Sequence, residues 1–230
     1  MNQRVCLVLL LLLHGALRAG AQSSRSIFDP EDEPRTFYGA LVGGCNVSQV
    51  DGDGFSGYHK LGFNAGAEVL VRFNENIGVS LDMLYSQKGS LDKRYSGDDF
   101  GNTYYNEYRL KLNYISIPLM LRVVGGNHFN YALGASYDLL ISSEEMFTTA
   151  YSSGTINPEG FPFQKGSVNA VGGFGYEFSK GWFIDARYEY SMTTIRKPLN
   201  IPVGYGGGVF PHQFNNVVTF RLAYFFHSRK

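Results

Sequence analysis

Cysteine is scarce in this sequence of 230 residues: only Cys6 and Cys45 are present. Cys6 lies in an N-terminal segment that we expect to be removed, so Cys45 has no partner for an intrachain disulfide. This count excludes the disulfide-dense scaffolds common among small secreted proteins. We interpret Cys45 as a small buried apolar residue rather than a nucleophile.

Charge and long apolar runs are scarce as well. Charged residues make up 17% of the chain, below the roughly 25% of ordinary soluble proteins, and 20 basic side chains balance 20 acidic ones. This balance gives no electrostatic argument for nucleic-acid binding. After the first 21 residues no apolar run approaches the ~18 residues of a transmembrane helix. Aromatic residues, in contrast, reach 15%. A chain that is poor in charge, rich in aromatic residues and without long apolar runs after residue 21 favours β-structure.

Residues 1–21 have the features of a secretory signal peptide. Arg4 supplies the positive start, Val5 to Leu13 form a short apolar core, and Ala19-Gly20-Ala21 is a small-residue cleavage site. We therefore expect an exported chain with a polar leader at residues 22–35 and one domain at residues 36–227. Without Arg4 and Arg18 its net charge would be −2.

From Thr36 onward apolar residues recur with a period of two, which predicts strands. Short connections rich in Gly, Asn and Ser alternate with long polar ones, as in an up-and-down outer-membrane barrel with tight periplasmic turns and long extracellular loops. The predicted fold of residues 36–227 is an eight-stranded antiparallel transmembrane β-barrel domain, with the leader at residues 22–35 in the periplasm. The expected strands are residues 36–46, 60–73, 77–90, 106–124, 128–141, 166–178, 182–195 and 215–227. The expected long loops are residues 47–59, 91–105, 142–165 and 196–214.

The polar face of the strands is mostly Gly, Ser, Ala and Asn with single charges, which suits the interior of a narrow barrel better than a surface in water. The apolar face is therefore predicted to meet lipid. Six basic and six acidic residues on the polar face are expected to form a lumen network, because an unpaired buried charge costs several kcal/mol. These are Glu68, Arg72, Asp82, Lys88, Arg109, Lys111, Asp138, Glu177, Asp185, Arg187, Glu189 and Arg221.

Aromatic residues cluster around the short turns and the chain ends, which predicts an aromatic girdle at the periplasmic membrane interface. Its expected members are Phe37, Phe73, Phe129, Tyr131, Phe178, Trp182, Tyr224 and Phe226, with Tyr38 and Phe183 beside them.

Apolar residues alternate at even-numbered positions from Tyr108 to Tyr114 and at odd-numbered positions from Ile115 to Val123. Pro118 lies within the second segment. We expect a β-bulge at Tyr114–Ser116 that inserts one residue and resets the strand's face. Ile115 to Val123 would then cross the membrane, with the preceding residues 106–113 as barrel wall above it. Because proline cannot donate to the ladder, Pro118 is expected at a local pairing defect.

Several stretches resemble the small outer-membrane β-barrel (PorT-like) domain common in Bacteroidetes. They are FYGALVGGCN, the hairpin GFNAGAEVLVRFNENIGVSLDMLYSQKGS, LNYISIPLMLR and VTFRLAYFF. The sequence departs from the commonest pattern in having Ser116 where a glutamate is frequent. The resemblance implies an outer-membrane location and an eight-stranded barrel, and one branch of the family serves type IX secretion and gliding.

We expect no catalytic residues, no cofactor and no metal site. His59, His128, His212 and His227 fall at separate rims or loops, and the Asp51-Gly52-Asp53-Gly54 stretch lacks the further ligands of a calcium loop. The predicted function is a structural or interaction barrel with a plugged interior, surrounded by outer-membrane lipid, whose long loops bind a protein or other surface ligand. A narrow solute channel and an accessory of a type IX secretion system are the alternatives, and no particular oligomeric state is predicted.

Overall fold

A computed structural model describes residues 37–55, 57–74, 76–97, 103–124, 128–148, 153–156, 160–196 and 212–226 of the chain. The predicted signal peptide and polar leader lie outside the described residues. Within these ranges, no helix is long and apolar enough to cross a membrane.

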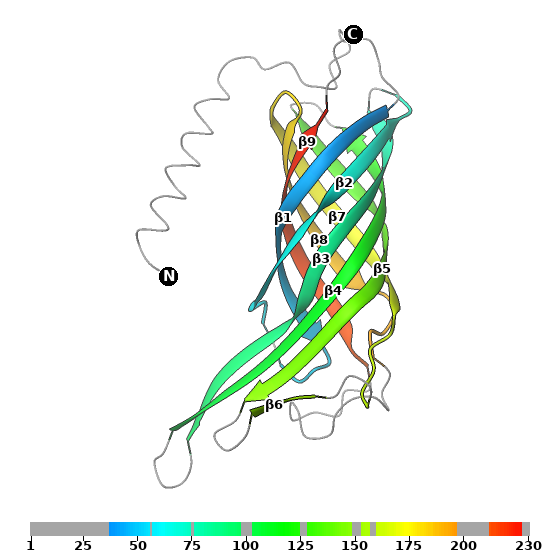
Figure 1. Ribbon diagram of the computed structural model, residues 1–230. Helices are drawn as coiled ribbons and strands as arrows, with labels where there is room; N and C mark the ends of the chain where they lie inside the picture. The colour runs from blue at the N-terminus through cyan, green and yellow to red at the C-terminus, as the bar shows by residue number, and fades with distance from the viewer. Residues whose placement is uncertain are drawn as a thin grey trace, which may run out of the picture.

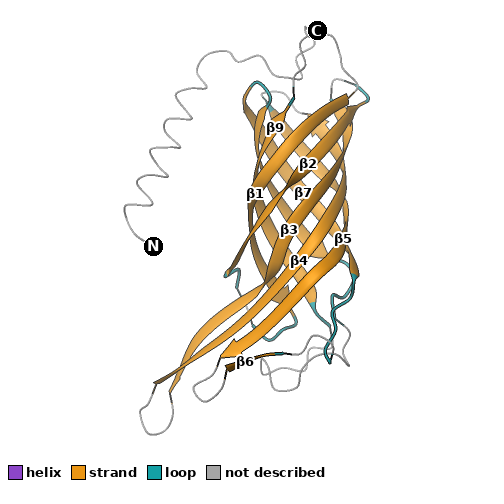
Figure 2. Ribbon diagram, viewed as in Figure 1, coloured by secondary structure: helices purple, strands orange, loops and turns teal. Residues whose placement is uncertain are grey.

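Eight long strands form a closed antiparallel ring, as the sequence predicts (Figures 1 and 2). Each strand pairs with the next along the chain, and β1 pairs with β9 to close the barrel. The short β6 pairs only with the end of β5. The strands are β1 (Phe37–Asp51), β2 (Lys60–Arg72), β3 (Ile77–Gly97), β4 (Thr103–Val124), β5 (Phe129–Thr148), β6 (Ser153–Thr155), β7 (Gly166–Ser179), β8 (Trp182–Ser191) and β9 (Phe214–Phe225).

The strand ends that short turns join lie at one rim of the barrel, and the strand ends that long connections join lie at the other (Figure 1). In the turn between β2 and β3, the Asn74 carboxamide oxygen accepts hydrogen bonds from the amides of Asn76 and Ile77, at 2.9 and 2.7 Å. Such a local side-chain cap is the reason asparagine favours tight turns. Between β7 and β8, Gly181 takes the positive φ of 80° that a tight turn requires.

The apolar face points outward and the polar face inward. On β4 the outward residues Ile117, Leu119, Leu121 and Val123 are 38–54% exposed, whereas Arg122 on the inward face is 3% exposed. The outward apolar run from Ile115 to Val123 matches the ~9–11 residues that a tilted strand needs to cross a bilayer.

Two of the predicted loops contain extended strand. β3 continues to Gly97, β4 begins at Thr103, and β5 continues to Thr148, so that this sheet projects beyond the other strands (Figure 1). We call this projecting sheet, Gly89–Gly97 with Thr103–Asn113 and Ser142–Thr148, the extension. Its two hairpin strands stay paired from Gly89–Lys111 to Gly97–Thr103. The expected loops at residues 91–105 and 142–165 were therefore wrong in their boundaries.

The expected bulge in β4 was also wrong. Even-numbered residues of β4 face inward without interruption from Tyr108 to Arg122, so the backbone never resets its face. What changes at Tyr114 is the environment. On the long-loop side of this level the inward residues of β4 are apolar, and on the short-turn side its outward residues are apolar while Ser116 and Arg122 face the lumen.

The irregularities lie in the pairing of β4 with its neighbours. The register between β4 and β5 shifts between Asn113, opposite Ser142, and Tyr114, opposite Leu140, so the extra residue is Ile141 of β5. On the other side, the β3–β4 ladder is interrupted between the pairs Leu81–Leu119 and Leu84–Ser116. Pro118 lies in this interruption, as expected for a residue that has no N–H to donate to the ladder.

Candidate functional site

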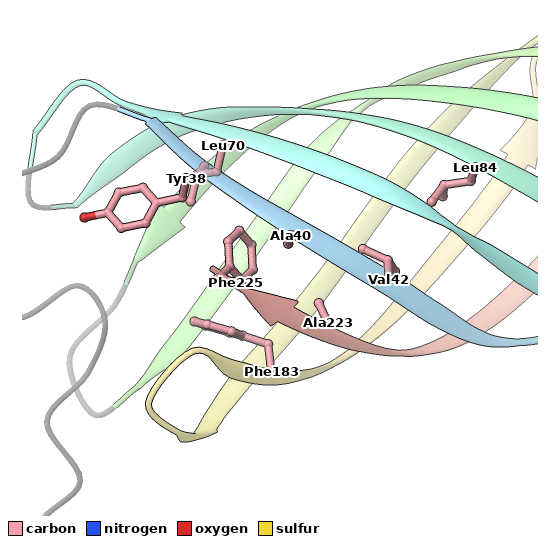
Figure 3. Packing of buried hydrophobic residues seen from close by; sticks show 8 residues of the cluster. All are labelled: Tyr38, Ala40, Val42, Leu70, Leu84, Phe183, Ala223 and Phe225. Atoms are coloured by element: carbon pink, nitrogen blue, oxygen red, sulfur yellow. The ribbon is translucent and has the colours of Figure 1, made fainter. Parts of the chain in front are cut away.

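The short-turn end of the lumen is filled by an apolar cluster drawn in Figure 3. The Phe183 and Phe225 rings meet edge to face, with centroids 5.0 Å apart, and β1 and β2 contribute Tyr38 and Leu70. Tyr38 and Phe183 were expected beside the outer girdle. Their exposed fractions of 5% and 2% show instead that they point inward.

The middle of the lumen holds a central cluster of three carboxylates and three guanidinium groups. Its members are Glu68, Asp82, Arg122, Asp185, Arg187 and Arg221. Arg221 lies among all three acids, with its nitrogens 2.8 Å from Asp82, 2.7 Å from Asp185 and 3.2 Å from Glu68. Arg122 of β4 approaches Glu68 of β2 at 2.6 Å.

A second buried group lies nearer the long-loop rim. Lys88 of β3 is 1% exposed, and its ammonium donates to both Asp138 of β5 and Glu189 of β8. The same nitrogen lies 5.5 Å from the centre of the Tyr114 ring. Three strands on different sides of the barrel are thus joined across the lumen by one cation.

Neutral polar side chains occupy the space between these two groups. Asn46 of β1 donates to Ser86, and its carboxamide oxygen accepts from Asn64 and Thr219 at 2.8 and 2.9 Å. A cavity of about 20 Å³ remains there, lined by these four residues and others. That volume holds about one water molecule, so the interior at this level is filled rather than open.

Four residues predicted for the network lie elsewhere. Arg109 and Lys111 point outward from the extension, where they pair with Glu107 at 2.6 Å and Glu144 at 2.9 Å. The predicted lumen position of Arg109 and Lys111 was wrong because the apolar residues of this part of β4 point into the lumen. Arg72 is half-buried at the short-turn rim beside Tyr38.

Glu177 is the fourth of these residues. It accepts a hydrogen bond from the Gly181 amide in the β7–β8 turn, at 2.9 Å. In contrast, Arg122 belongs to the central cluster but was absent from the predicted network.

The long-loop end of the lumen is closed by a second apolar cluster around one buried ion pair. Tyr108, Leu110, Leu112 and Tyr114 of β4 pack with residues that include Val50, Phe163 and Ile195. Arg196, 1% exposed, donates to Glu145 at 2.6 Å, and its guanidinium lies 3.6 Å above the Phe163 ring. The alternation of apolar and polar residues over 108–114 in the sequence indicates an apolar face on this strand. It does not indicate that this face points into the lumen.

The described histidines form no catalytic set. His128 is 3.9 Å from Glu177, and of the described histidines none hydrogen-bonds both a serine and a carboxylate. No group of three or more His, Cys, Asp or Glu residues is placed to hold a metal ion within the described ranges. His227 lies outside these ranges. Cys45 is exposed on the outer face of β1, so its interpretation as a buried residue was wrong.

Comparison with known proteins identifies the family. A family model described as the outer membrane protein beta-barrel domain matches residues 21–196, about three quarters of the chain. The chain belongs to this outer-membrane barrel family. No curated protein matches the sequence. The narrower resemblance to the PorT-like branch stays a prediction.

Solved structures with a similar arrangement include two bacterial surface barrels. The attachment invasion locus protein Ail of Yersinia pestis has 17% sequence identity, with 84% of this chain and 100% of that chain covered and a TM-score of 0.46. Ail has also been solved with the heparin analogue sucrose octasulfate. Neisserial surface protein A has 14% identity, with 84% and 98% covered and a TM-score of 0.44.

The outer-membrane barrel has its short turns on the periplasmic side and its long loops outside. The predicted girdle residues lie near the periplasmic rim. Phe37, Phe73, Phe129, Tyr131, Trp182 and Phe226 are 39–68% exposed, and Phe178 and Tyr224 are half-buried. The Trp182 and Tyr224 rings contact each other with centroids 4.7 Å apart. An amphipathic ring pair at this rim is the arrangement expected at a membrane–water boundary.

Asp53 in the first extracellular loop is expected to make the closure of that loop depend on pH. Burial raises the pKa of its carboxyl from 3.8 to about 6, and the neighbouring Asp51 adds to the rise, although hydrogen bonds from Ser90 and the Phe55 amide oppose it. Between pH 4 and 6 the folded loop holds a proton that the opened loop releases. The closed form of the loop therefore loses stability relative to the open form as the pH rises from about 4 to 6.

We expect the loop that carries Asp53 to open about tenfold less often at pH 5 than at pH 7.5, a difference of roughly 1.4 kcal/mol. Hydrogen exchange, corrected for the intrinsic pH dependence, measures this opening. An Asp53→Asn variant should show no such difference. An equal pH response in both proteins would assign the effect to another group.

Proposed function

We propose that the protein is a non-catalytic interaction barrel, in which the filled lumen holds the extension rigidly above the outer membrane. The observation that supports this proposal is the extension itself. β2 pairs with β3 only from Arg72–Gly78 to Asn64–Ser86. Beyond that point, residues Leu91–Tyr95 pair with β4 and with no second strand in the described part of the chain.

An unpaired strand edge presents a row of N–H and C=O groups to which another extended segment can pair. The tip adds aromatic surface, because Tyr95 is 75% exposed and its ring lies 5.5 Å from that of Tyr105. Charged side chains on the same strand, Lys93 and Arg94, give polar contacts. The partner that fits this edge is a polypeptide with an extended segment.

A photo-crosslinking amino acid at Leu91 or Tyr95, introduced in intact cells, tests this function. We expect polypeptide adducts from both positions. The same probe at Leu119, which faces lipid at 54% exposure, is the control and should give none. The absence of polypeptide adducts at the β3 edge, with normal surface display, would overturn the proposal.

The secretion-accessory alternative makes a different prediction. It requires that the barrel co-purifies with a type IX machine and that its deletion impairs secretion. A deletion strain with normal secretion would remove this alternative.

A further inference from the structure

The free edge of β3 carries a sequence that is complementary to itself. The segment LDKRY begins at Leu91 and has an acid directly before the central Lys93 and a base directly after it. When two antiparallel copies pair about Lys93, Asp92 of each lies opposite Arg94 of the other. Leu91 of each then lies opposite Tyr95 of the other. Directly opposite residues on antiparallel strands share a face, where opposite charges attract each other.

The charged side chains of this segment share the face that the pairing requires. Arg94 lies on the inner face of the extension, because its guanidinium is 5.2 Å from the centre of the Phe55 ring, which stacks on the inward Tyr108. Asp92 is on the same face, 2.7 Å from Arg94. The Arg94 side chain is 54% exposed, so this pair within one strand is weak and a facing copy can share its charges.

Other registers of the same two segments match their charges less well. Pairing about Asp92 puts that acid opposite itself, and pairing about Arg94 puts that base opposite itself. A shift by one residue pairs Asp92 with Lys93 but leaves Leu91 opposite Arg94. Pairing about Lys93 brings two lysines together, but Glu107 of β4 lies 3.9 Å from Lys93 and offsets their repulsion.

The tilt of the strands determines where the second copy lies. Strands of an outer-membrane barrel are inclined by roughly 35–45° to the membrane normal, and the extension also leans (Figure 1). Two copies in one membrane are related by a two-fold axis along the normal, so their β3 strands would cross at about twice that angle instead of running antiparallel. A two-fold axis that lies between two facing membranes allows the antiparallel arrangement.

We propose that the β3 edge pairs with the β3 edge of a second copy of this chain in a facing outer membrane, about a two-fold axis at Lys93. The proposal rests on the proposed function, because it names the partner of the same edge. Backbone hydrogen bonds supply the attraction, and the two Asp92–Arg94 pairs select the register and the partner. A single contact of this length is weak, but many copies on two surfaces act together.

Vesicle association tests this pairing. The full-length barrel is reconstituted into two batches of lipid vesicles with different dyes, and two-colour fluorescence cross-correlation measures how many vesicles move together. Wild-type batches should associate. Asp92→Lys in both batches, or Arg94→Glu in both, should reduce the association roughly tenfold, because both cross-strand pairs then join like charges.

Mixing the two variants is the decisive arm of this experiment. One batch with Asp92→Lys and one with Arg94→Glu should associate as the wild type does, because every pair across the contact again joins opposite charges. The control Lys165→Glu reverses an exposed charge in the connection between β6 and β7 and should leave the association unchanged. The heat-dependent gel shift of folded barrels confirms that each variant is folded.

Cysteine crosslinking tests the register in a Cys45→Ala background. Lys93→Cys should form disulfide-linked dimers between vesicles under a mild oxidant, because directly opposite Cα atoms lie within disulfide reach. Leu91→Cys should link to Tyr95→Cys but not to itself. Dimers of Leu91→Cys alone would contradict this register.

Three results would overturn the proposal: wild-type vesicles that stay apart, association that survives both single variants, and mixed batches that fail to associate. The proposed function fails by a different result, the absence of polypeptide adducts at the β3 edge. If wild-type vesicles stayed apart while Leu91 and Tyr95 gave adducts in cells, the barrel would still bind a polypeptide, but not a second copy of itself.

Discussion

Replacing Arg221 with methionine is expected to lower the free energy of unfolding by about 3–5 kcal/mol, because it leaves a buried carboxylate without a cation. Arg221 is 4% exposed and contacts three acids, whereas the remaining Arg122 and Arg187 must then balance Glu68, Asp82 and Asp185. Urea titration of the barrel in lipid vesicles, with Trp182 fluorescence as the readout, measures the change.

Arg94→Met is the control for this experiment. Arg94 pairs with Asp92 at 2.7 Å, but its side chain is 54% exposed, so the loss should stay below about 1 kcal/mol. Similar losses for the two variants would show that the lumen pairs are no more important than a surface pair.

The second large effect is expected at Lys88. Lys88→Met should cost about 3–5 kcal/mol, because Asp138 and Glu189 then face each other without the cation between them. The cost should shrink when the acids are neutralised as well. The triple variant Lys88→Met/Asp138→Asn/Glu189→Gln is therefore expected to be more stable than the single variant in the same urea titration.

The comparison of the single and triple variants distinguishes the cost of unpaired buried charges from the cost of lost packing. Residues in one buried ion network show interaction energies of about 0.5–3 kcal/mol. If the triple variant were less stable than Lys88→Met, the loss would come from packing around Tyr114 and not from unpaired carboxylates.

The ring, its up-and-down order and the segregation of loop lengths were all predictable from the sequence. The reason is that a transmembrane barrel imposes a period of two and puts turn residues such as Asn74 at fixed points. The apolar-out direction followed from the composition of the polar face. The extension was missed because Leu91–Tyr95 have water on their outer side, where few apolar residues mark a strand.

The position of Arg109 and Lys111 was not predictable from alternation alone. In the membrane the apolar face of a strand points out, but above the membrane the apolar residues Leu110 and Leu112 seal the lumen and are 0% exposed. The parity change at Tyr114–Ile115 records this inversion of environment. This change was expected to arise from a β-bulge in β4, whereas the extra residue is Ile141 of β5.

Three layers fill the described lumen: the apolar cluster near the periplasmic turns, the ionic groups in the middle, and the apolar cluster with Arg196 at the mouth. An eight-stranded barrel has an interior that its side chains can fill. The central claim is therefore that the barrel is closed and that function resides outside the membrane.

Single-channel recording in planar lipid bilayers tests this claim most directly. The purified barrel, inserted with its fold verified, should give no steady open currents at moderate voltages. Steady, voltage-sustained open currents from the wild-type protein would contradict the filled lumen and favour the solute-channel alternative.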